Sequence, residues 1–282
     1  MPCPQALRNL TGTVIDGNLE LVSVLGEGSY GMVYQARVTD APNQYLAVKC
    51  MWRSRRRTPQ ARLQAKELRN HKAVSKHQGV ITLHCQIVTD DFVFIVLDLA
   101  ETDLYKVIAS GRVFCHRPYR VRQAMNSMLN ALSYMHRKGV FHRDITPENV
   151  LCDRMLNGVD IRFADFGLST PRAFSSRHGC GSLPYMSPEA LDYDHPSARS
   201  GYSTISSDLW ALAIIFCALV SGDLPWARAH PSDRAYALFL ADEDYLLGHH
   251  KVPMTAMQSH SQLGSFFFPF PLGSKHSSDA KA

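Results

Sequence analysis

The sequence predicts an α+β protein with a β-rich N-terminal part and a helical C-terminal part. Residues 19–97 contain five runs of Val, Ile, Leu and aromatic residues, and the turns between them carry Gly, Asn or Asp. Beyond Asp103, apolar residues recur every three or four positions, as on the buried face of a helix. The chain has 282 residues and 45% hydrophobic content, enough for one large domain or two lobes.

Composition excludes several classes of protein. The net charge of +5 is mild and demands neither nucleic acid nor membrane, although it suits an anionic ligand. Seven scattered cysteines without a Cys-x-x-Cys pair favour free thiols over a disulfide framework or a zinc site. No signal peptide is visible, and the longest apolar run, residues 209–220, is short for a membrane span and predicts a buried helix. We therefore expect an intracellular, monomeric protein with neither a nucleic-acid nor a membrane partner.

The first strands enclose a glycine-rich loop. Residues 1–18 are expected to form an N-terminal extension or a partial edge strand, and residues 19–25 form a strand. Residues 26–31 read Gly-Glu-Gly-Ser-Tyr-Gly, a spacing that also occurs in dinucleotide-binding turns that open a helix. Residues 32–38 are β-branched and aromatic, so the loop joins two strands instead.

A lysine and a glutamate follow on separate elements. Lys49 lies in the third strand, residues 45–50, and Glu67 follows eighteen residues later on a helix predicted over residues 60–77. Between them, residues 53–57 (Arg-Ser-Arg-Arg-Arg) predict a solvated basic loop. A phosphoacceptor at Thr58 or a site for an acidic partner is the alternative. Strands at residues 81–84 and 92–97 complete a five-stranded lobe, with a turn at 89–91.

The C-terminal part carries polar motifs between helices. An apolar stripe over residues 121–135 predicts a helix that leads to residues 142–149, His-Arg-Asp-Ile-Thr-Pro-Glu-Asn. A short hairpin over residues 150–164 precedes Asp-Phe-Gly at 165–167, and Ser-Pro-Glu follows at 187–189. Serines 206 and 207 suit the start of the most apolar helix, and Ser221-Gly222 signals its end.

Six of these signals, in this order over residues 19–247, make the chain resemble a eukaryotic-type Ser/Thr protein kinase. Residues 179–189, 206–212 and 223–226 are similar to the fungal Ran-like kinases of nutrient and meiotic signalling. The resemblance implies a bilobal kinase-like fold, with an N-lobe over residues 19–99 and a C-lobe over residues 100–251. It also implies ATP and Mg²⁺ as cofactors, and protein substrates with Ser or Thr acceptors.

The resemblance assigns roles to individual residues. Asp144 would accept or orient the proton of the substrate hydroxyl, and Glu67 would hold Lys49 against the ATP phosphates. Arg143 would pair with a phosphorylated activation segment, residues 165–189, in which Ser175 and Ser176 are candidate acceptors. Asn149 and Asp165 would bind magnesium. The remaining nucleotide-binding residues would be Gly26, Gly28, Gly31, Val33, Ala47, Asp98, Ala100 and Leu151.

Two departures from the family pattern bear on activity. Thr146 stands where Ser/Thr kinases carry a lysine that neutralises the transferring phosphoryl group, a loss of about 3–4 kcal/mol by analogy with deleted oxyanion donors. Tyrosine kinases also lack that lysine, but Pro147-Glu148-Asn149 and Ser182 fit the Ser/Thr type. We expect weak Ser/Thr kinase activity, with a silent pseudokinase that binds nucleotide or partners as the alternative.

The second departure is at the C-terminal end. After about Lys251 the resemblance stops, and residues 252–282 are expected to form an atypical, disordered tail. No arginine follows Arg234, so Glu189 is expected to lack the cation that pairs with it in the family. We therefore expect a C-lobe without its last helices. A truncated or mis-spliced reading frame explains this pattern, and a docking tail is the alternative.

Overall fold

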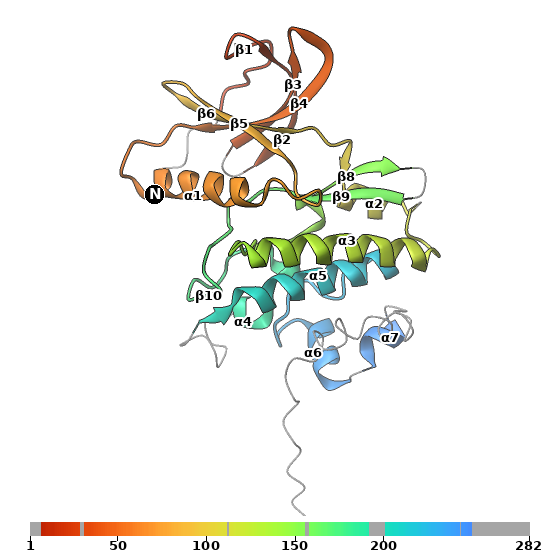
Figure 1. Ribbon diagram of the computed structural model, residues 1–282. Helices are drawn as coiled ribbons and strands as arrows, with labels where there is room; N and C mark the ends of the chain where they lie inside the picture. Colours follow the sequence, from red (N-terminus) through yellow and green to blue (C-terminus); the bar gives the residue numbers. More distant parts are fainter. Residues whose placement is uncertain are drawn as a thin grey trace, which may run out of the picture.

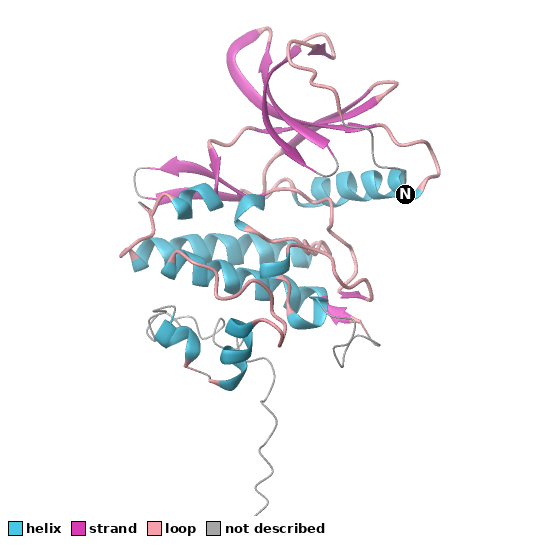
Figure 2. Cartoon of the chain, turned by 180° about the vertical axis from the view of Figure 1, so that it is seen from behind, coloured by secondary structure: helices cyan, strands magenta, loops and turns pink. Residues whose placement is uncertain are grey.

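The computed structural model describes residues 7–28, 31–111, 113–155, 158–191, 201–242 and 244–249. A β-rich lobe stands above a mostly helical lobe, and the chain passes from one to the other after strand β6 (Figures 1 and 2). This arrangement agrees with the predicted bilobal α+β fold. The predicted disordered tail and the question of further C-terminal helices lie outside the described residues.

The N-lobe is a curled antiparallel sheet of six strands in the order β1-β2-β3-β4-β6-β5. Its strands are β1 (Val14–Ile15), β2 (Leu19–Gly28), β3 (Gly31–Val38), β4 (Ala41–Trp52), β5 (Leu83–Val88) and β6 (Phe92–Asp98). Burial alternates along β3, and Tyr34, Ala36 and Val48 of β3 and β4 are fully enclosed. The two-residue strand β1 pairs with β2, and Leu10 and Ile15 join the same core, so residues 10–15 pack on this lobe.

Strand β5 begins later than the sequence pattern predicts. The predicted strand covers residues 81–84, whereas β5 runs from Leu83 to Val88. The Ile81 N–H donates instead to the Phe163 carbonyl at 2.9 Å, which ties this stretch to the C-lobe. An apolar run thus marked a contact between lobes as well as a strand.

Helix α1 (Pro59–Val74) packs below the sheet (Figure 1). Thr58 is its N-cap, because the Thr58 hydroxyl accepts a hydrogen bond from the Ala61 N–H at 3.2 Å, and Pro59 occupies the first turn. The buried face of α1 is mostly polar: it consists of Glu67, Asn70, His71 and Val74, at the spacing of one helical face. A polar buried face requires polar partners, and these lie in the candidate site.

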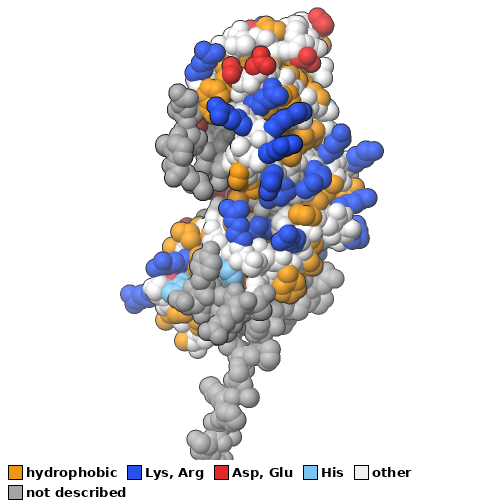
Figure 3. Space-filling model, turned by 90° about the vertical axis from the view of Figure 1, so that its left-hand side faces the viewer, with side chains coloured by type: hydrophobic (Ala, Val, Ile, Leu, Met, Phe, Trp, Pro, Cys, Tyr) orange, Lys and Arg blue, Asp and Glu red, His pale blue; other side chains and the backbone are white. Residues whose placement is uncertain are grey.

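The face formed by α1 and the loop before it is strongly basic. The four arginines of residues 53–57 are exposed, and the exposed side of α1 adds Arg62 and Arg69. Figure 3 shows Lys and Arg side chains spread over this face. Arg53 donates to the Thr89 carbonyl at 2.9 Å, which holds the loop on the sheet edge.

The C-lobe is built around two helices, α3 (Pro118–Arg137) and α5 (Thr204–Ser221), which lie side by side (Figure 1). The predicted stripe on α3 is observed, with Val121, Ala124, Met125, Met128, Leu132 and Met135 buried. Helix α5 begins at Thr204 and is capped by the hydroxyl of Ser203, two residues before the predicted start. It ends at Gly222 with a left-handed φ of 85°, as predicted.

Shorter elements complete the C-lobe. A three-stranded sheet contains β7 (Thr102–Asp103), β8 (Val150–Met155) and β9 (Gly158–Phe163), and β10 (Phe174–Ser175) pairs with β11 (Tyr202–Ser203). The remaining elements are the helices α2 (Leu104–Ala109), α4 (Pro188–Leu191), α6 (Arg234–Ala241) and α7 (Tyr245–His249), and the 3-10 turns η1 (Pro147–Asn149) and η2 (Leu183–Tyr185).

Helix α5 is the one helix in the described ranges whose length and composition would allow it to cross a membrane. Of this helix, 67% is buried inside the protein, as in the core helix of a lobe. All six cysteines within the described residues are free thiols.

Candidate active site

The lysine of β4 and the glutamate of α1 form an ion pair between sheet and helix. The Lys49 Nζ lies 2.7 Å from Glu67 Oε1 and 3.1 Å from Asp165 Oδ1. Burial lowers the pKa of the Lys49 ammonium, but the Asp165 and Glu67 carboxylates outweigh it and hold that pKa above its ordinary value. The structure therefore joins three residues from three separate motifs around one fixed positive charge.

Asp165 is held ionised by the same contacts. Burial would raise its carboxyl pKa, but Lys49 and the Gly167 N–H, which donates to Asp165 Oδ1 at 3.0 Å, hold the pKa below its usual value. Its backbone adopts a left-handed φ of 58°, a region that non-glycine residues rarely occupy. Such a conformation is kept only where the surroundings fix it, which is typical of functional sites.

A stack of rings holds the Asp-Phe-Gly segment against α1. The His71 ring stacks on the Phe166 ring, with 4.5 Å between centroids. The His142 ring also contacts Phe166, with 5.1 Å between centroids. The amide of Asn70 donates to the Ser169 hydroxyl at 3.0 Å in the buried interior. These contacts account for the polar buried face of α1, and they fix Glu67 and Asp165 relative to each other.

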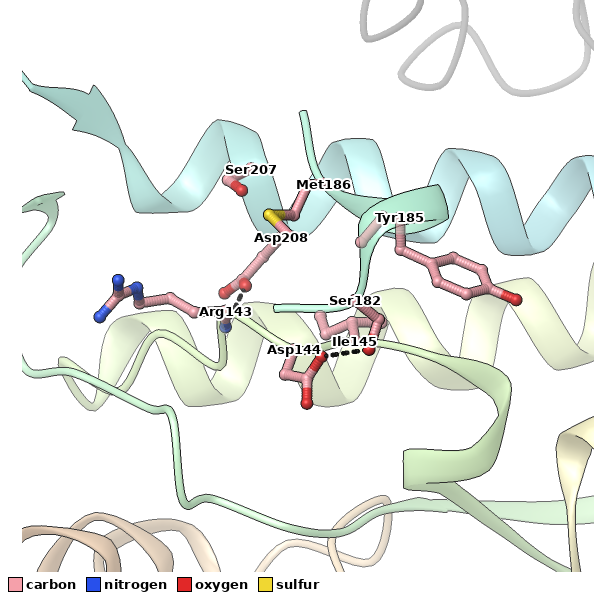
Figure 4. Close-up of a pocket in the computed structure, with 9 residues that line it drawn as sticks. Arg143, Asp144, Ile145, Ser182, Tyr185, Met186, Ser207 and Asp208 are labelled. Carbon is pink, nitrogen blue, oxygen red and sulfur yellow. Dashed lines mark hydrogen bonds between the residues drawn. The ribbon is translucent and has the colours of Figure 1, made fainter. Parts of the chain in front are cut away.

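Both carboxylate oxygens of Asp144 accept hydrogen bonds from the chain. The Ser182 hydroxyl donates to Asp144 Oδ1 at 2.9 Å (Figure 4), and the Asn149 amide donates to Asp144 Oδ2 at 3.2 Å. The same amide donates to the Asp144 carbonyl at 2.9 Å. The Asn149 carbonyl in turn accepts from the Ala164 N–H at 2.9 Å, directly before Asp165. Residues 142–149, called the catalytic loop below, and the Asp-Phe-Gly segment at residues 165–167 are therefore linked through Asn149.

A buried carboxylate from α5 holds the start of this loop. Asp208 is 1% exposed, and its Oδ1 accepts from the Arg143 N–H at 2.7 Å (Figure 4), while its Oδ2 accepts from the His142 N–H at 2.9 Å. The His136 ring contacts the same Oδ2 at 2.8 Å. Sequence reasoning treated residues 206–212 as a helix start and missed this role. An acidic residue in the first turns of so apolar a helix was the available signal.

Arg143 does not contact the Asp144 carboxylate. Its guanidinium points away from Asp144 (Figure 4) and reaches the activation segment, where it donates to the Arg177 carbonyl at 3.0 Å. Of the two predicted phosphoacceptors, Ser176 is exposed, whereas the Ser175 hydroxyl accepts from the Arg177 N–H at 3.1 Å. The structure thus places Arg143 as a link to the activation segment.

The predicted nucleotide-binding residues outside the glycine-rich loop come from both lobes. Val33 of β3 lies opposite Lys49 in the β3–β4 register, and Ala47 is two positions away on β4. Leu151 is on β8 and Ala100 follows β6, and both are partly buried. The Asp98 carboxylate is engaged elsewhere, since it contacts His84 Nε2 at 2.6 Å and Arg162 Nη1 at 3.3 Å. If Asp98 binds nucleotide as predicted, it must do so through its backbone, because its carboxylate already contacts His84 and Arg162.

The three glycines of the β2–β3 loop differ in their surroundings. A side chain at Gly31 would meet the Cys50 carbonyl at 2.3 Å, so packing against β4 requires glycine there. A Cβ at Gly26 would meet nothing within 4 Å, and one at Gly28 only the Gly31 carbonyl at 3.9 Å. Gly26 and Gly28 thus leave open space above the strand, as a phosphate-binding loop needs.

The oxygen atoms present suit magnesium bound together with phosphates. Among the described residues no group of three or more His, Cys, Asp or Glu side chains forms a complete metal site. Asp165 and Asn149 each keep a side-chain oxygen, and magnesium is commonly bound by one or two protein oxygens plus substrate phosphates. The residues therefore fit Mg²⁺ held jointly with a nucleotide.

Thr146 supplies no cation to this site. It is 3% exposed, and its hydroxyl caps η1 by accepting from the Asn149 N–H at 3.4 Å. Among the described residues no cation forms an ion pair with Glu189, and its expected lack of a partner stays a prediction. Glu189 is only partly buried, so leaving it unpaired costs less than for a buried carboxylate.

Comparison with known proteins identifies the family. A model of the protein kinase domain matches residues 19–261. The "Negative regulator of sexual conjugation and meiosis" of Schizosaccharomyces pombe is 34% identical over 256 residues, covering 84% of this chain and 54% of the relative. Serine/threonine-protein kinase VHS1 of Saccharomyces cerevisiae is 33% identical over 192 residues, covering 64% and 41%. CBL-interacting protein kinase 1 of Oryza sativa subsp. japonica is 33% identical over 233 residues, covering 79% and 47%.

The chain spans about half the length of these relatives. The two fungal relatives confirm the resemblance to fungal Ser/Thr kinases, and the family match confirms the kinase-like fold class. With the Lys49–Glu67–Asp165 group and the Asp144 loop in place, this chain belongs to the protein kinase domain family.

Proposed function

We propose that this chain is an ATP-dependent protein kinase that phosphorylates Ser or Thr residues of protein substrates. The observation that carries the proposal is the assembled group around Lys49 and Asn149. Lys49 contacts both Glu67 and Asp165. The Asn149 amide donates to the Asp144 carboxylate, and the Asn149 carbonyl accepts from the Ala164 N–H. The proton acceptor, the phosphate-binding cation and the metal ligands are thus fixed relative to one another.

Each residue contributes through position and charge. Asp144 accepts or orients the proton of the substrate hydroxyl, and its two hydrogen bonds fix where that hydroxyl binds. Lys49 carries a charge that the paired carboxylates maintain, which suits it for the α- and β-phosphates. Asn149 and Asp165 would hold the Mg²⁺ that accompanies ATP, and this ion would neutralise charge on the transferring phosphoryl group.

Two features favour Ser and Thr as acceptors. Pro147-Glu148-Asn149 and Ser182 fit the Ser/Thr type, and the Ser182 hydroxyl contacts the Asp144 carboxylate at 2.9 Å. A relative is named as a serine/threonine-protein kinase. That the protein acts as an intracellular monomer, without nucleic acid or membrane, remains a prediction.

A second candidate function rests on Thr146. Because its hydroxyl caps η1 and carries no charge, the transferring phosphoryl group lacks one donor worth about 3–4 kcal/mol, or about 10²–10³ in rate. The second candidate is therefore a pseudokinase that binds nucleotide or a partner and transfers phosphate very slowly or not at all.

Phosphotransfer to the chain itself and to generic Ser/Thr peptides separates the two candidates. Asp144→Asn is the inactive control, and Asp90→Asn, in the exposed turn between β5 and β6, is the matched control for the substitution itself. We expect the wild type and Asp90→Asn to incorporate phosphate above Asp144→Asn. A thermal shift with Mg-ATP but no transfer above Asp144→Asn would establish the pseudokinase instead.

A further inference from the structure

Arg143 occupies a constrained place between the catalytic loop and the activation segment. Its φ is +69°, a left-handed conformation rare for arginine, and its N–H is held by Asp208 Oδ1 at 2.7 Å. With the backbone fixed in this way, the side chain leaves the loop in one direction. Its Nε donates to the Tyr202 hydroxyl at 3.2 Å, and its Nη2 donates to the Arg177 carbonyl at 3.0 Å.

Tyr202 is itself held firmly. It is 2% exposed, and β11, on which it lies, pairs with β10 so that Tyr202 is opposite Ser175. Gly201 allows this pairing, because a Cβ there would meet the Ser175 carbonyl at 2.7 Å and its φ is +81°. The Tyr202 hydroxyl also donates to the Arg177 carbonyl at 3.3 Å. Arg143, Tyr202 and Arg177 thus form a closed set of three hydrogen bonds.

The surroundings make these neutral acceptors necessary. Burial lowers the pKa of Lys66 on α1, and the charges of Arg143 and Arg177 lower it further, whereas Cys180 and Glu67 act in the opposite direction. None of the carboxylates in the described ranges forms an ion pair with Arg143. The guanidinium is therefore held against like-charge repulsion by a phenol oxygen, a peptide carbonyl and the Tyr202 ring, 6.0 Å away.

We propose that Tyr202 is a positioning residue, whose hydroxyl holds Arg143 and the activation segment together and so fixes Asp144. The inference rests on the proposed kinase function for its catalytic consequence. Two paths lead from this set to the Asp144 carboxylate. One is the backbone from Arg143 to Asp144, and the other is the segment from Arg177 to Ser182, whose hydroxyl donates to Asp144 Oδ1 at 2.9 Å.

The test compares Tyr202→Phe with Tyr45→Phe. Both substitutions remove one phenol oxygen, and Tyr45 on β4 lies opposite Arg37 of β3 in the N-lobe sheet, away from the catalytic loop. Tyr202→Phe keeps the buried ring and its packing. Amide hydrogen exchange is measured over residues 172–182 and over α5, and kcat and the KM for ATP are measured separately for each variant.

For Tyr202→Phe we expect faster exchange over residues 172–182 and unchanged exchange over α5. We also expect kcat to fall roughly tenfold with an unchanged KM for ATP, the loss of one hydrogen bond to a charged group. Tyr45→Phe should match the wild type in all four readouts. This pattern would support the positioning role.

Other outcomes overturn the proposal. Unchanged exchange over residues 172–182 in Tyr202→Phe would show that the hydroxyl holds nothing. Faster exchange throughout α5 and the N-lobe sheet would show that the hydroxyl supports the fold in general. A wild type without transfer above Asp144→Asn would overturn the proposed function alone, and faster exchange confined to residues 172–182 would then still support the anchoring.

Discussion

Asp208→Asn removes the charge that holds the start of the catalytic loop. In the wild type, the two Asp208 oxygens accept three hydrogen bonds, from the His142 N–H, the Arg143 N–H and the His136 ring. An asparagine has only one acceptor oxygen. Its NH₂ group would therefore face at least one of these donors, which would be left without an acceptor. Losing one charge-assisted bond and weakening the others should lower the free energy of unfolding by about 2–4 kcal/mol.

The same substitution should impair catalysis. Arg143 directly precedes Asp144, so a shift of the loop moves the carboxylate, and a misplacement on the order of 1 Å can cost about 10²-fold in rate. We expect kcat to fall between about tenfold and a hundredfold, with a smaller change in the KM for ATP. Urea unfolding gives the stability, and steady-state phosphotransfer gives the kinetic constants.

Asp233→Asn is the matched control for Asp208→Asn. Asp233 caps α6 and accepts from the N–H groups of Ala227, Arg228, Ala235 and Tyr236, so it too serves several backbone donors. It has no contact with the catalytic loop in these hydrogen bonds, so its asparagine variant should lose about 0.5–2 kcal/mol of stability and keep its kcat. A stable Asp208→Asn variant with wild-type kcat would refute the reasoning.

Three further predictions concern single positions. Thr146→Lys should raise kcat by up to about 10²–10³ in the phosphotransfer assay while losing the η1 cap, and an unchanged kcat would show that the missing cation is not limiting. Burial lowers the pKa of His71 to about 4. Below pH 6.5 the His71 ring takes up a proton in the unfolded chain but not in the folded one. The free energy of unfolding therefore falls as the pH falls from 6.5 towards about 4. In urea unfolding, the wild type should lose about 1.5 kcal/mol more free energy of unfolding between pH 6.5 and 5 than His71→Gln does. An equal loss in both proteins would contradict this expectation. Arg162→Lys should lower stability by about 1 kcal/mol, because lysine cannot contact the Asp98 and Asp153 carboxylates together, and an unchanged melting temperature would contradict this expectation.

Local sequence pattern predicted much of the fold. The β-branched residues after Gly31 predicted a hairpin in place of a strand–helix turn, and β2 and β3 form that hairpin. Errors occurred where contacts distant in sequence decide a boundary. Ile81 belongs to no strand because its N–H bonds Phe163, eighty-two positions away, and α5 starts at Thr204 because Ser203, paired to β10, supplies the cap.

The candidate site divides in the same way. The motifs of Lys49, Glu67 and Asp165 carry enough local pattern to be read from sequence, and the structure brings them together. An acidic residue in so apolar a helix signals that Asp208 has buried polar partners, but local pattern cannot name them, because they lie 65 and 66 positions earlier. Thr146 was read only as a missing lysine, although threonine before Pro-Glu-Asn was a readable signal for the turn that it caps. The Asp98 carboxylate could not be placed, because its partners His84 and Arg162 come from both lobes.

Transfer of the γ-phosphoryl group of ATP to a Ser/Thr peptide, measured for the wild type beside Asp144→Asn, tests the proposed function most directly. Asp144 is held by Ser182 and Asn149 next to the Lys49–Asp165 pair, so we expect transfer by the wild type and its loss in the variant, with Mg-ATP binding retained in both. Equal incorporation by the two proteins, at any level, would contradict the assignment of Asp144 as the residue that orients the substrate hydroxyl.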